Sequence, residues 1–222
     1  MIFFDIDATL LDHEYAENKG ALDYFYQRTD SFDLTDEEFI NKWNDLSKKH
    51  FQRFLDGHLS FQEQRQVRIK ELYGTDLTNA QADREFDYYL QLYKENWKAF
   101  DDVISCLDLL LDKKYKLGII SNGDYEQQIE KLDKIGITQY FSYIFTSSKL
   151  GVAKPDSNIF LEACYQANCN VSESYYVGDN LEIDTVGSLN AGMKGIWLNR
   201  KNEPFSHSGT TIHSLKELGA LF

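Results

Sequence analysis

Short apolar runs alternate with longer amphipathic stretches over much of the chain. The runs, rich in Ile, Val, Phe and Tyr, lie at 2–4, 116–121, 143–146, 175–178 and 194–198. Apolar runs without polar alternation are typical of strands buried on both faces of a sheet. Helical spacing of apolar residues is found at 103–111, 125–135, 159–167 and 183–191. This order predicts an α/β fold with a Rossmann-like, doubly wound parallel sheet covered by helices on both sides.

The pattern changes between residues 13 and 97, where helical spacing dominates. Thr35 with Glu38 and Ser60 with Glu63 have the spacing of capping boxes, which mark helix starts. The expected apolar face of the first of these helices consists of Phe39, Ile40, Trp43 and Leu46. A later helix is expected at 79–97, with Phe86, Leu90, Tyr93 and Trp97 on one face. We therefore predict two domains, a core formed by 1–12 and 98–222 and an inserted all-helical domain at 13–97.

The composition is that of a globular protein with an excess of acidic residues. The chain has 222 residues, with 23 Lys+Arg against 36 Asp+Glu and a formal net charge of −13. An acidic protein repels phosphate backbones and anionic lipid surfaces, so we expect neither a nucleic acid polymer nor a membrane as its partner. A small anionic substrate remains possible if local groups reverse the sign of the field. We expect a monomer or a homodimer.

Cysteine usage and the absence of long apolar runs suggest a compartment. Cys106, Cys164 and Cys169 are odd in number and lack the spacing of zinc ligands, so we expect reduced thiols. No apolar run approaches the roughly 18 residues of a membrane span, and the first residues lack the pattern of a signal peptide. These features predict a cytoplasmic protein.

Polar residues follow the predicted strands. In chain order they are Asp5, Asp7 and Thr9, then Ser121, Asn122 and Gly123, then Lys154, and finally Asp179 and Asp184. The carboxyl ends of parallel strands meet at one edge of a sheet, where ligands bind. Carboxylates gathered there repel each other, and a bound cation relieves the repulsion. Oxygen ligands without His or Cys favour Mg²⁺, which with Lys154 would supply a local positive field. Ser121 and the amides after it can bind phosphate oxygens.

Four segments in this order resemble the motif series of the haloacid dehalogenase (HAD)-like hydrolase superfamily. They lie at 4–11, 119–123, 154–155 and 177–184. The helical insertion between the first and second motifs resembles the cap of the first subclass, so the resemblance covers essentially the whole chain. Dehalogenating members lack a second acid two residues after the nucleophile and need no metal. Because Asp7 and Asp179 are both present, the resemblance implies the phosphatase branch.

The resemblance also implies catalytic roles. Asp5 would be the nucleophile that forms an aspartyl-phosphate. Asp7 would be the general acid that protonates the leaving oxygen and then the base that activates water. Thr9 would brace the loop that carries both. Lys154 would offset the charge of Asp5 and of the phosphate.

Ligand binding follows from the same resemblance. The phosphoryl group would be bound by Ser121, Asn122 and Gly123. Magnesium would be held by the Asp5 carboxylate, the Asp7 main-chain carbonyl and Asp179. Asp184 would be an outer partner of the ion or a ligand through water.

In the helical domain, Arg53 and Arg68 are our candidate substrate contacts. Arg53 precedes a loop at 55–58, and cap loops in this subclass resemble a lid that selects substrates. Lys48 and Lys49 would matter if the chain cleaved phosphonates, because such an enzyme needs a cap lysine in its site. A solvated helix face is the simpler interpretation of these two lysines.

We therefore predict a magnesium-dependent phosphatase that hydrolyses a small phosphomonoester, either a nucleoside monophosphate or a sugar phosphate, through an aspartyl-phosphate on Asp5. The same motifs also serve phosphosugar mutases. A phosphate-sensing or regulatory protein without turnover and a receiver-like phosphoacceptor share the aspartate, magnesium and lysine constellation. A regulatory protein without turnover would leave the filled catalytic positions unexplained. A receiver-like phosphoacceptor would leave the helical domain unexplained.

Overall fold

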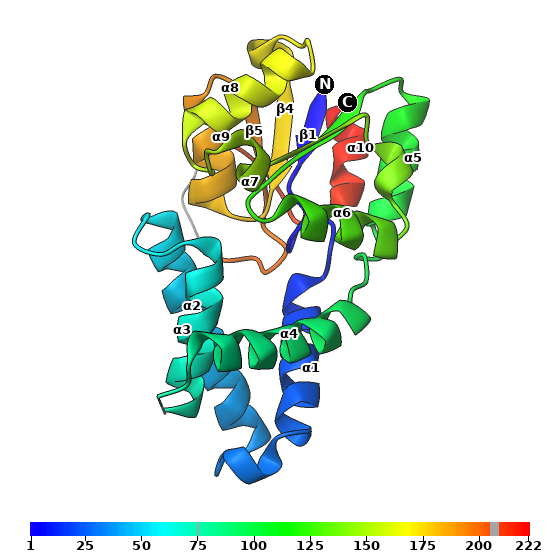
Figure 1. The fold of residues 1–222 in the computed structure, drawn as a ribbon. Coiled ribbons are helices and arrows are strands. Elements are labelled where there is room, and N and C mark those ends of the chain that lie inside the picture. Colours follow the sequence, from blue (N-terminus) through cyan, green and yellow to red (C-terminus); the bar gives the residue numbers. More distant parts are fainter. Residues whose placement is uncertain (75, 205–208) are drawn as a thin grey trace. The chain divides into compact units, whose positions relative to one another are not determined.

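The computed structural model describes residues 1–74, 76–204 and 209–222. The chain forms two compact units (Figure 1). The core unit consists of Met1–Asp12 and Lys98–Phe222, and the helical unit consists of His13–Trp97. In the part of the chain that is described, no helix has both the length and the apolar character that crossing a bilayer requires.

A parallel sheet of six strands organises the core unit, with the order β3-β2-β1-β4-β5-β6. The strands are β1 (Ile2–Phe4), β2 (Leu117–Ser121), β3 (Tyr143–Thr146), β4 (Tyr175–Gly178), β5 (Lys194–Leu198) and β6 (Thr210–Ile212). The predicted doubly wound α/β fold is confirmed. The edge strand β6 was not predicted, because three residues without an apolar run give no periodic signal.

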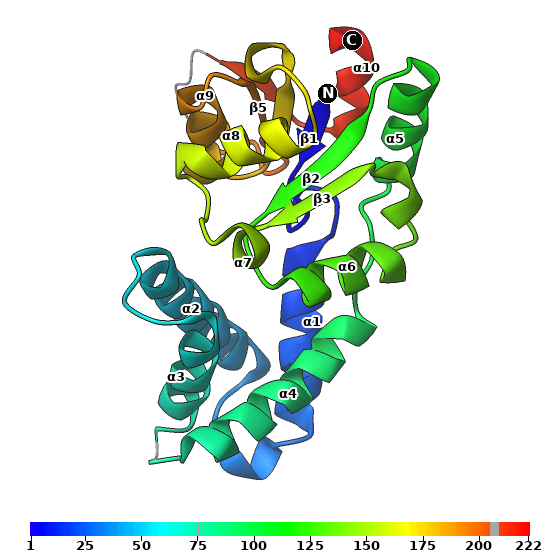
Figure 2. The same ribbon diagram turned by 45° about the horizontal axis from the view of Figure 1, so that its top comes forward.

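Helices cover both faces of this sheet (Figure 2). They are α5 (Val103–Asp112), α6 (Tyr125–Lys134), α7 (Ser147–Leu150), α8 (Ser157–Gln166), α9 (Gly187–Asn190) and α10 (Leu218–Leu221), with short 3₁₀ turns at Thr138–Tyr140, Val171–Glu173 and Leu215–Glu217. Successive strand residues point to opposite faces. Phe3 and Tyr176 therefore pack with Phe160 of α8, whereas Phe4 lies in edge contact with Phe141 on the other face.

The segment after β4 differs from the expected α-helix at 183–191. Leu181–Val186 is a π-helical turn, and α9 is only four residues long. The Asn180 side chain accepts hydrogen bonds from the amides of Glu182 and Ile183, which starts the turn two residues early. A Cβ on Gly178 would lie 2.4 Å from Cγ of Asp184, so only glycine admits this carboxylate at the strand end. π-turns of this kind are frequent at functional sites.

The helical unit contains four helices in its described residues, α1 (His13–Tyr26), α2 (Asp36–Leu55), α3 (Phe61–Tyr73) and α4 (Asn79–Glu95), with a 3₁₀ turn at Thr29–Ser31. Both expected capping boxes form, and Thr78 with Gln81 forms a third. The buried face of α2 is Phe39, Trp43, Leu46 and His50, while Ile40 is half-buried at its edge. The buried face of α4 contains Tyr89 instead of the expected Leu90, because Ala82, Phe86, Tyr89 and Tyr93 follow one stripe.

Candidate active site

Three carboxylates converge at the carboxyl edge of the sheet in the core unit. Asp5 follows β1, Asp179 follows β4, and Asp184 lies in the π-helical turn. One oxygen from each lies within 4.8 Å of the other two. Asp5 and Asp184 are buried, and Asp179 is half-buried. The donor set fits Mg²⁺, which prefers carboxylate oxygens and water to nitrogen and sulfur ligands.

Lys154 is the cation that contacts this cluster in the described part of the chain. Its Nζ lies 2.7 Å from Oδ1 of Asp5, 2.7 Å from Oδ1 of Asp184 and 2.8 Å from the Tyr176 hydroxyl. The Tyr176 hydroxyl in turn lies 2.7 Å from the Ile120 carbonyl, to which it donates. Burial alone would lower the pKa of Lys154, but the two carboxylates outweigh it and raise that pKa, so the ammonium form is stable there.

Burial and mutual repulsion disfavour ionisation of the carboxylates. Burial raises the pKa of Asp5 to about 6; the charge of Lys154 opposes this, and the charges of Asp184 and Asp7 add to it. The pKa of Asp179 is raised well above its usual value, first by burial and then by Asp184 and Asp5. A divalent cation among the three would remove the repulsion that one ammonium leaves uncompensated.

Asp7 has a basic partner of its own in Lys131. Both of its carboxylate oxygens lie 2.7 Å from Nζ of Lys131, and Oδ2 accepts from Nε2 of Gln128 at 3.2 Å. Lys131 and Gln128 lie three residues apart on α6, and both are buried. Ala8, which follows Asp7, has a φ of 61°, a left-handed conformation that is uncommon for residues other than glycine.

The expected phosphate-binding residues lie at the same edge of the sheet, but two of them are engaged by protein groups. The Asn122 side chain accepts from the Lys154 amide at 2.8 Å and donates to the Lys154 carbonyl at 3.0 Å. The Gly123 amide donates to Oγ of Ser147 at 2.9 Å. These bonds connect the loop after β2 to the Lys154 loop and to the start of α7, and phosphate binding by Asn122 and Gly123 stays a prediction. The Ser121 hydroxyl accepts from Gln128 at 2.8 Å.

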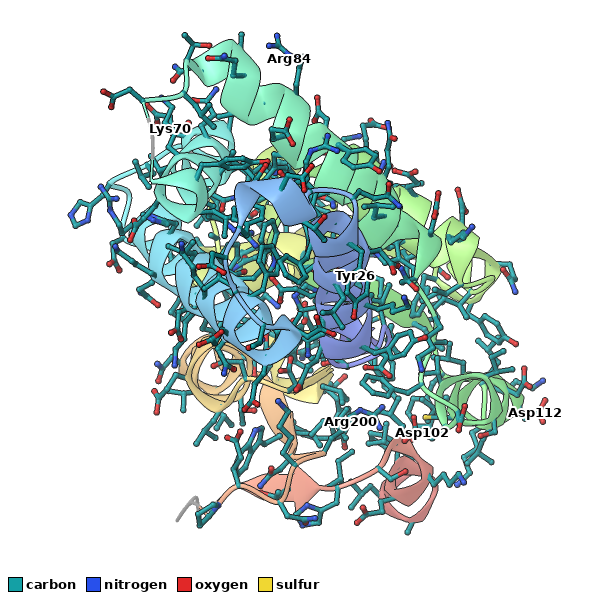
Figure 3. All side chains as sticks on the ribbon, turned by 90° about the horizontal axis from the view of Figure 1, so that it is seen from below. Tyr26, Lys70, Arg84, Asp102, Asp112 and Arg200 are labelled. Atoms are coloured by element: carbon teal, nitrogen blue, oxygen red, sulfur yellow. The ribbon has the colours of Figure 1, made fainter. Side chains whose placement is uncertain are left out.

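Thr9 and a later arginine fix the loop after β1. The buried Thr9 hydroxyl lies 3.5 Å from Oδ1 of Asp179, and the Thr9 carbonyl accepts from Nη2 of Arg200 at 2.9 Å. Arg200 also pairs through both terminal nitrogens with Asp102, each at 2.9 Å; both residues are labelled in Figure 3. The loop that carries Asp5 and Asp7 is thereby tied to the start of α5.

The two arginines expected to contact substrate differ in the helical unit. Arg53 is exposed in the last turn of α2, with Nη1 3.3 Å from Nδ1 of His50. Arg68 is buried, and its Nη2 lies 3.3 Å from Oε1 of Glu17. Its guanidinium also lies over the Trp43 ring, 5.0 Å from the centroid. Arg68 is therefore paired within the helical unit, and a substrate contact by either arginine stays a prediction.

Sequence reasoning missed three buried residues of the site, namely Tyr176, Gln128 and Lys131. Tyr176 lies within an apolar strand and has no feature that distinguishes it from a core aromatic. Gln128 and Lys131 are separated by three positions, which places them on one face of the predicted helix at 125–135. That spacing was a usable signal, but the helix face it defines could not be assigned to the site from sequence.

Comparisons with known proteins agree with this arrangement. Residues 2–198 match the family model described as haloacid dehalogenase-like hydrolase. The chain is 31% identical over 201 residues to glyceraldehyde 3-phosphate phosphatase of Methanothermobacter thermautotrophicus, covering 89% of this chain and 84% of the relative. It is 30% identical over 228 residues to the pyrimidine 5'-nucleotidase YjjG of Escherichia coli, covering 99% and 96%.

A solved structure has the same fold. The magnesium-bound putative HAD-hydrolase YfnB of Bacillus subtilis matches with a TM-score of 0.84 and 22% identity, covering 99% of this chain and 96% of that one. The likeness extends over both the sheet and the helical insertion, because it spans nearly the whole chain.

Proposed function

The chain belongs to the haloacid dehalogenase-like hydrolase family, and we propose that it is a magnesium-dependent phosphatase that hydrolyses a small phosphomonoester through an aspartyl-phosphate on Asp5. The observation that carries this proposal is the cluster of Asp5, Asp179 and Asp184, whose oxygens lie within 4.8 Å of one another beside the Lys154 ammonium. Three carboxylates around one ammonium suit a site that binds a divalent cation and an anionic substrate.

The proposed reaction has two steps. An Asp5 carboxylate oxygen attacks phosphorus, the bond from phosphorus to the ester oxygen breaks, and the leaving oxygen takes a proton from the Asp7 carboxyl group. Water then attacks the aspartyl-phosphate and gives a proton to the Asp7 carboxylate, which releases inorganic phosphate and restores Asp5. Lys154 stabilises the charge on Asp5 and on the transferred group, and Ser121 contributes its hydroxyl to phosphate binding.

Magnesium would be held by the carboxylates of Asp5 and Asp179 and by the main-chain carbonyl of Asp7, with Asp184 as an outer partner. Bound there, it would neutralise charge on the phosphoryl oxygens. Asp184 already accepts from Lys154 through Oδ1 and from the Asn180 amide at 3.0 Å through Oδ2. These bonds favour an orienting role for Asp184 over direct ligation.

We further propose that the helical unit serves as the cap and that Arg53 takes part in choosing the substrate. The relatives named for a triose phosphate and for pyrimidine nucleotides support sugar phosphates and nucleoside monophosphates as the substrate classes. A panel of both classes, scored by kcat/KM, identifies the preferred one. Arg53→Ala should change the ranking in the panel, whereas Lys48→Ala on the same helix should not.

The mechanism is tested with p-nitrophenyl phosphate. We expect turnover that requires Mg²⁺, is lost with a chelator, and falls by at least about 10³-fold in Asp5→Asn. Activity that survives either the substitution or chelation would refute the mechanism. Transfer of the phosphoryl group to a sugar phosphate, instead of release to water, would favour a mutase.

A further inference from the structure

The buried pair Lys131 and Gln128 links two groups of the proposed site. Lys131 contacts both oxygens of Asp7 at 2.7 Å. Gln128 Nε2 lies 3.2 Å from Oδ2 of Asp7 and 2.8 Å from Oγ of Ser121. The side chains come from successive turns of one helix face. A single rigid element therefore contacts both the expected acid/base and the expected phosphate-binding hydroxyl.

The orientation of the Gln128 amide is determined by its neighbours. Nε2 faces three acceptors, namely Oδ2 of Asp7, Oγ of Ser121 and the Asn122 carbonyl at 3.2 Å. The opposite orientation would place the amide oxygen against a carboxylate, which is unfavourable. Because the Ser121 hydroxyl accepts from Gln128, its own proton points elsewhere. Its nearest acceptor in the described residues is the Asn122 carbonyl at 3.5 Å, a long contact that a phosphoryl oxygen can replace.

Local backbone geometry keeps this space open for the amide. Gly123 has a φ of 136°, which disfavours any side chain at this position. A Cβ there would also lie 3.3 Å from Nε2 of Gln128. Lys131 has only 6% of its side chain exposed, whereas Asp7 has 28% exposed, so Asp7 is the more accessible member of the pair.

We propose that Lys131 and Gln128 are positioning residues. They hold the Asp7 carboxylate and the Ser121 hydroxyl at the positions that phosphoryl transfer requires. The inference rests on the proposed function, in which Asp7 exchanges a proton with the leaving oxygen and with water. Lys131 acts through Asp7 and does not itself contact the reacting atoms. Loss of Lys131 should therefore give a partial form of the defect caused by loss of Asp7.

The test compares Lys131→Met with Lys131→Arg and with Lys134→Met, which removes an exposed lysine from the last turn of the same helix. With p-nitrophenyl phosphate we expect Lys131→Met to lower kcat at least about tenfold and to lower KM with it, because slowing the second step leaves kcat/KM little changed. Lys131→Arg should recover most of the loss, and Lys134→Met should match the wild type. Gln128→Leu, which keeps the ammonium, provides a second variant if Lys131→Met does not fold.

Phosphoenzyme accumulation separates positioning from a general loss of structure. The p-nitrophenolate leaving group needs no proton, so a misplaced Asp7 slows mainly the second step. Acid-quenched Lys131→Met should then carry more aspartyl-phosphate than the wild type at steady state. In an Asp7→Asn background, adding Lys131→Met should change neither kcat nor the phosphoenzyme level, because its target is gone.

Two results would overturn the inference. One is a kcat for Lys131→Met within about twofold of the wild type. The other is an equal further loss in the Asp7→Asn background, which would mean that Lys131 acts on the substrate directly. Failure of the proposed function is distinguishable from both, because the wild type itself would then form no aspartyl-phosphate and release no p-nitrophenol.

Discussion

Glu17 in the helical unit and Asp5 in the core unit are both carboxylates largely removed from water, yet their surroundings act on them in opposite directions. Glu17 accepts from Ser47 at 2.7 Å and from Arg68 at 3.3 Å through Oε1, and His13 lies 3.4 Å from Oε2. Burial raises its pKa, but His13, Arg68 and Ser47 together lower it to about 2. For Asp5 burial prevails, and the pKa is about 6.

The difference lies in how many donors each carboxylate has. Glu17 is one carboxylate with three donors from its own unit. Asp5, Asp179 and Asp184 are three carboxylates around Lys154, so the same chemical group is left incompletely neutralised. A satisfied buried carboxylate stabilises a fold, whereas an unsatisfied cluster is where a chain binds an ion. Substitutions in the cluster should therefore change activity and the response to magnesium, whereas substitutions at Glu17 should change stability.

Asp179→Asn should have the largest effect. It removes a carboxylate from the proposed magnesium site, so we expect kcat to fall by about 10²–10³-fold. In the wild type, magnesium at a hundred times its Kd should stabilise the fold by about 2.7 kcal/mol, and the variant should lose most of this gain. Calorimetry with and without Mg²⁺ measures the stabilisation. If Asp179→Asn were stabilised by magnesium as much as the wild type, the cluster would not be the ion-binding region that distinguishes it from Glu17.

Glu17→Gln should destabilise the helical unit by about 3 kcal/mol, because it leaves the Arg68 guanidinium buried without its charge partner. The free energy of unfolding from denaturant titration measures this. The double variant Glu17→Leu with Arg68→Leu should recover much of the loss. The magnesium response should persist in Glu17→Gln, in contrast to Asp179→Asn.

Acid should act on Glu17 with a definite sign. Its pKa is lowered from 4.5 to about 2, so its contribution is fully present above pH 4.5 and is lost as the pH falls toward 2. Thermal unfolding followed between pH 5 and pH 2 should show a loss that Glu17→Gln lacks. If stability fell equally with pH in the wild type and in Glu17→Gln, the partners of Glu17 would not lower its pKa as described.

Tyr176→Phe should have the smallest effect. It removes the hydroxyl that accepts from Lys154 at 2.8 Å, at a cost of about 1 kcal/mol in stability. Lys154 keeps both carboxylate partners, so stabilisation of the fold by Mg²⁺ should remain. We expect kcat to fall only a few-fold. Stopped assays and thermal unfolding provide the check. A loss of kcat as large as that of Asp179→Asn would place Tyr176 among the essential groups of the site.

The sheet and its strand ends were predictable from local sequence. The apolar runs indicate the buried strands, and the polar residues that follow them mark where the strands end. Asp5, Asp179 and Asp184 could be placed together because parallel strands end at one edge. The π-helical turn could not be predicted, since it depends on Gly178 admitting Asp184 and on the amides that Asn180 caps. Short β6 lacked periodicity.

The partners of the site residues were harder to predict than the residues themselves. Asn122 follows a strand, where a phosphate ligand is expected. Its side-chain amide also forms hydrogen bonds with the main chain of Lys154, 32 residues away in sequence. Arg68 has a charge suited to a phosphate, but its helix face turns it toward Glu17. Such pairings depend on tertiary packing, which no local pattern contains.

Acid-quench peptide mass spectrometry shows whether Asp5 accepts the phosphoryl group. The Asp7→Asn enzyme, mixed with p-nitrophenyl phosphate and Mg²⁺, is quenched in acid and digested. We predict a phosphorylated peptide with the modification on Asp5, absent without Mg²⁺ and absent when Asp5→Asn is added. Phosphate on another residue, or no phosphopeptide while p-nitrophenol is released, would contradict the account.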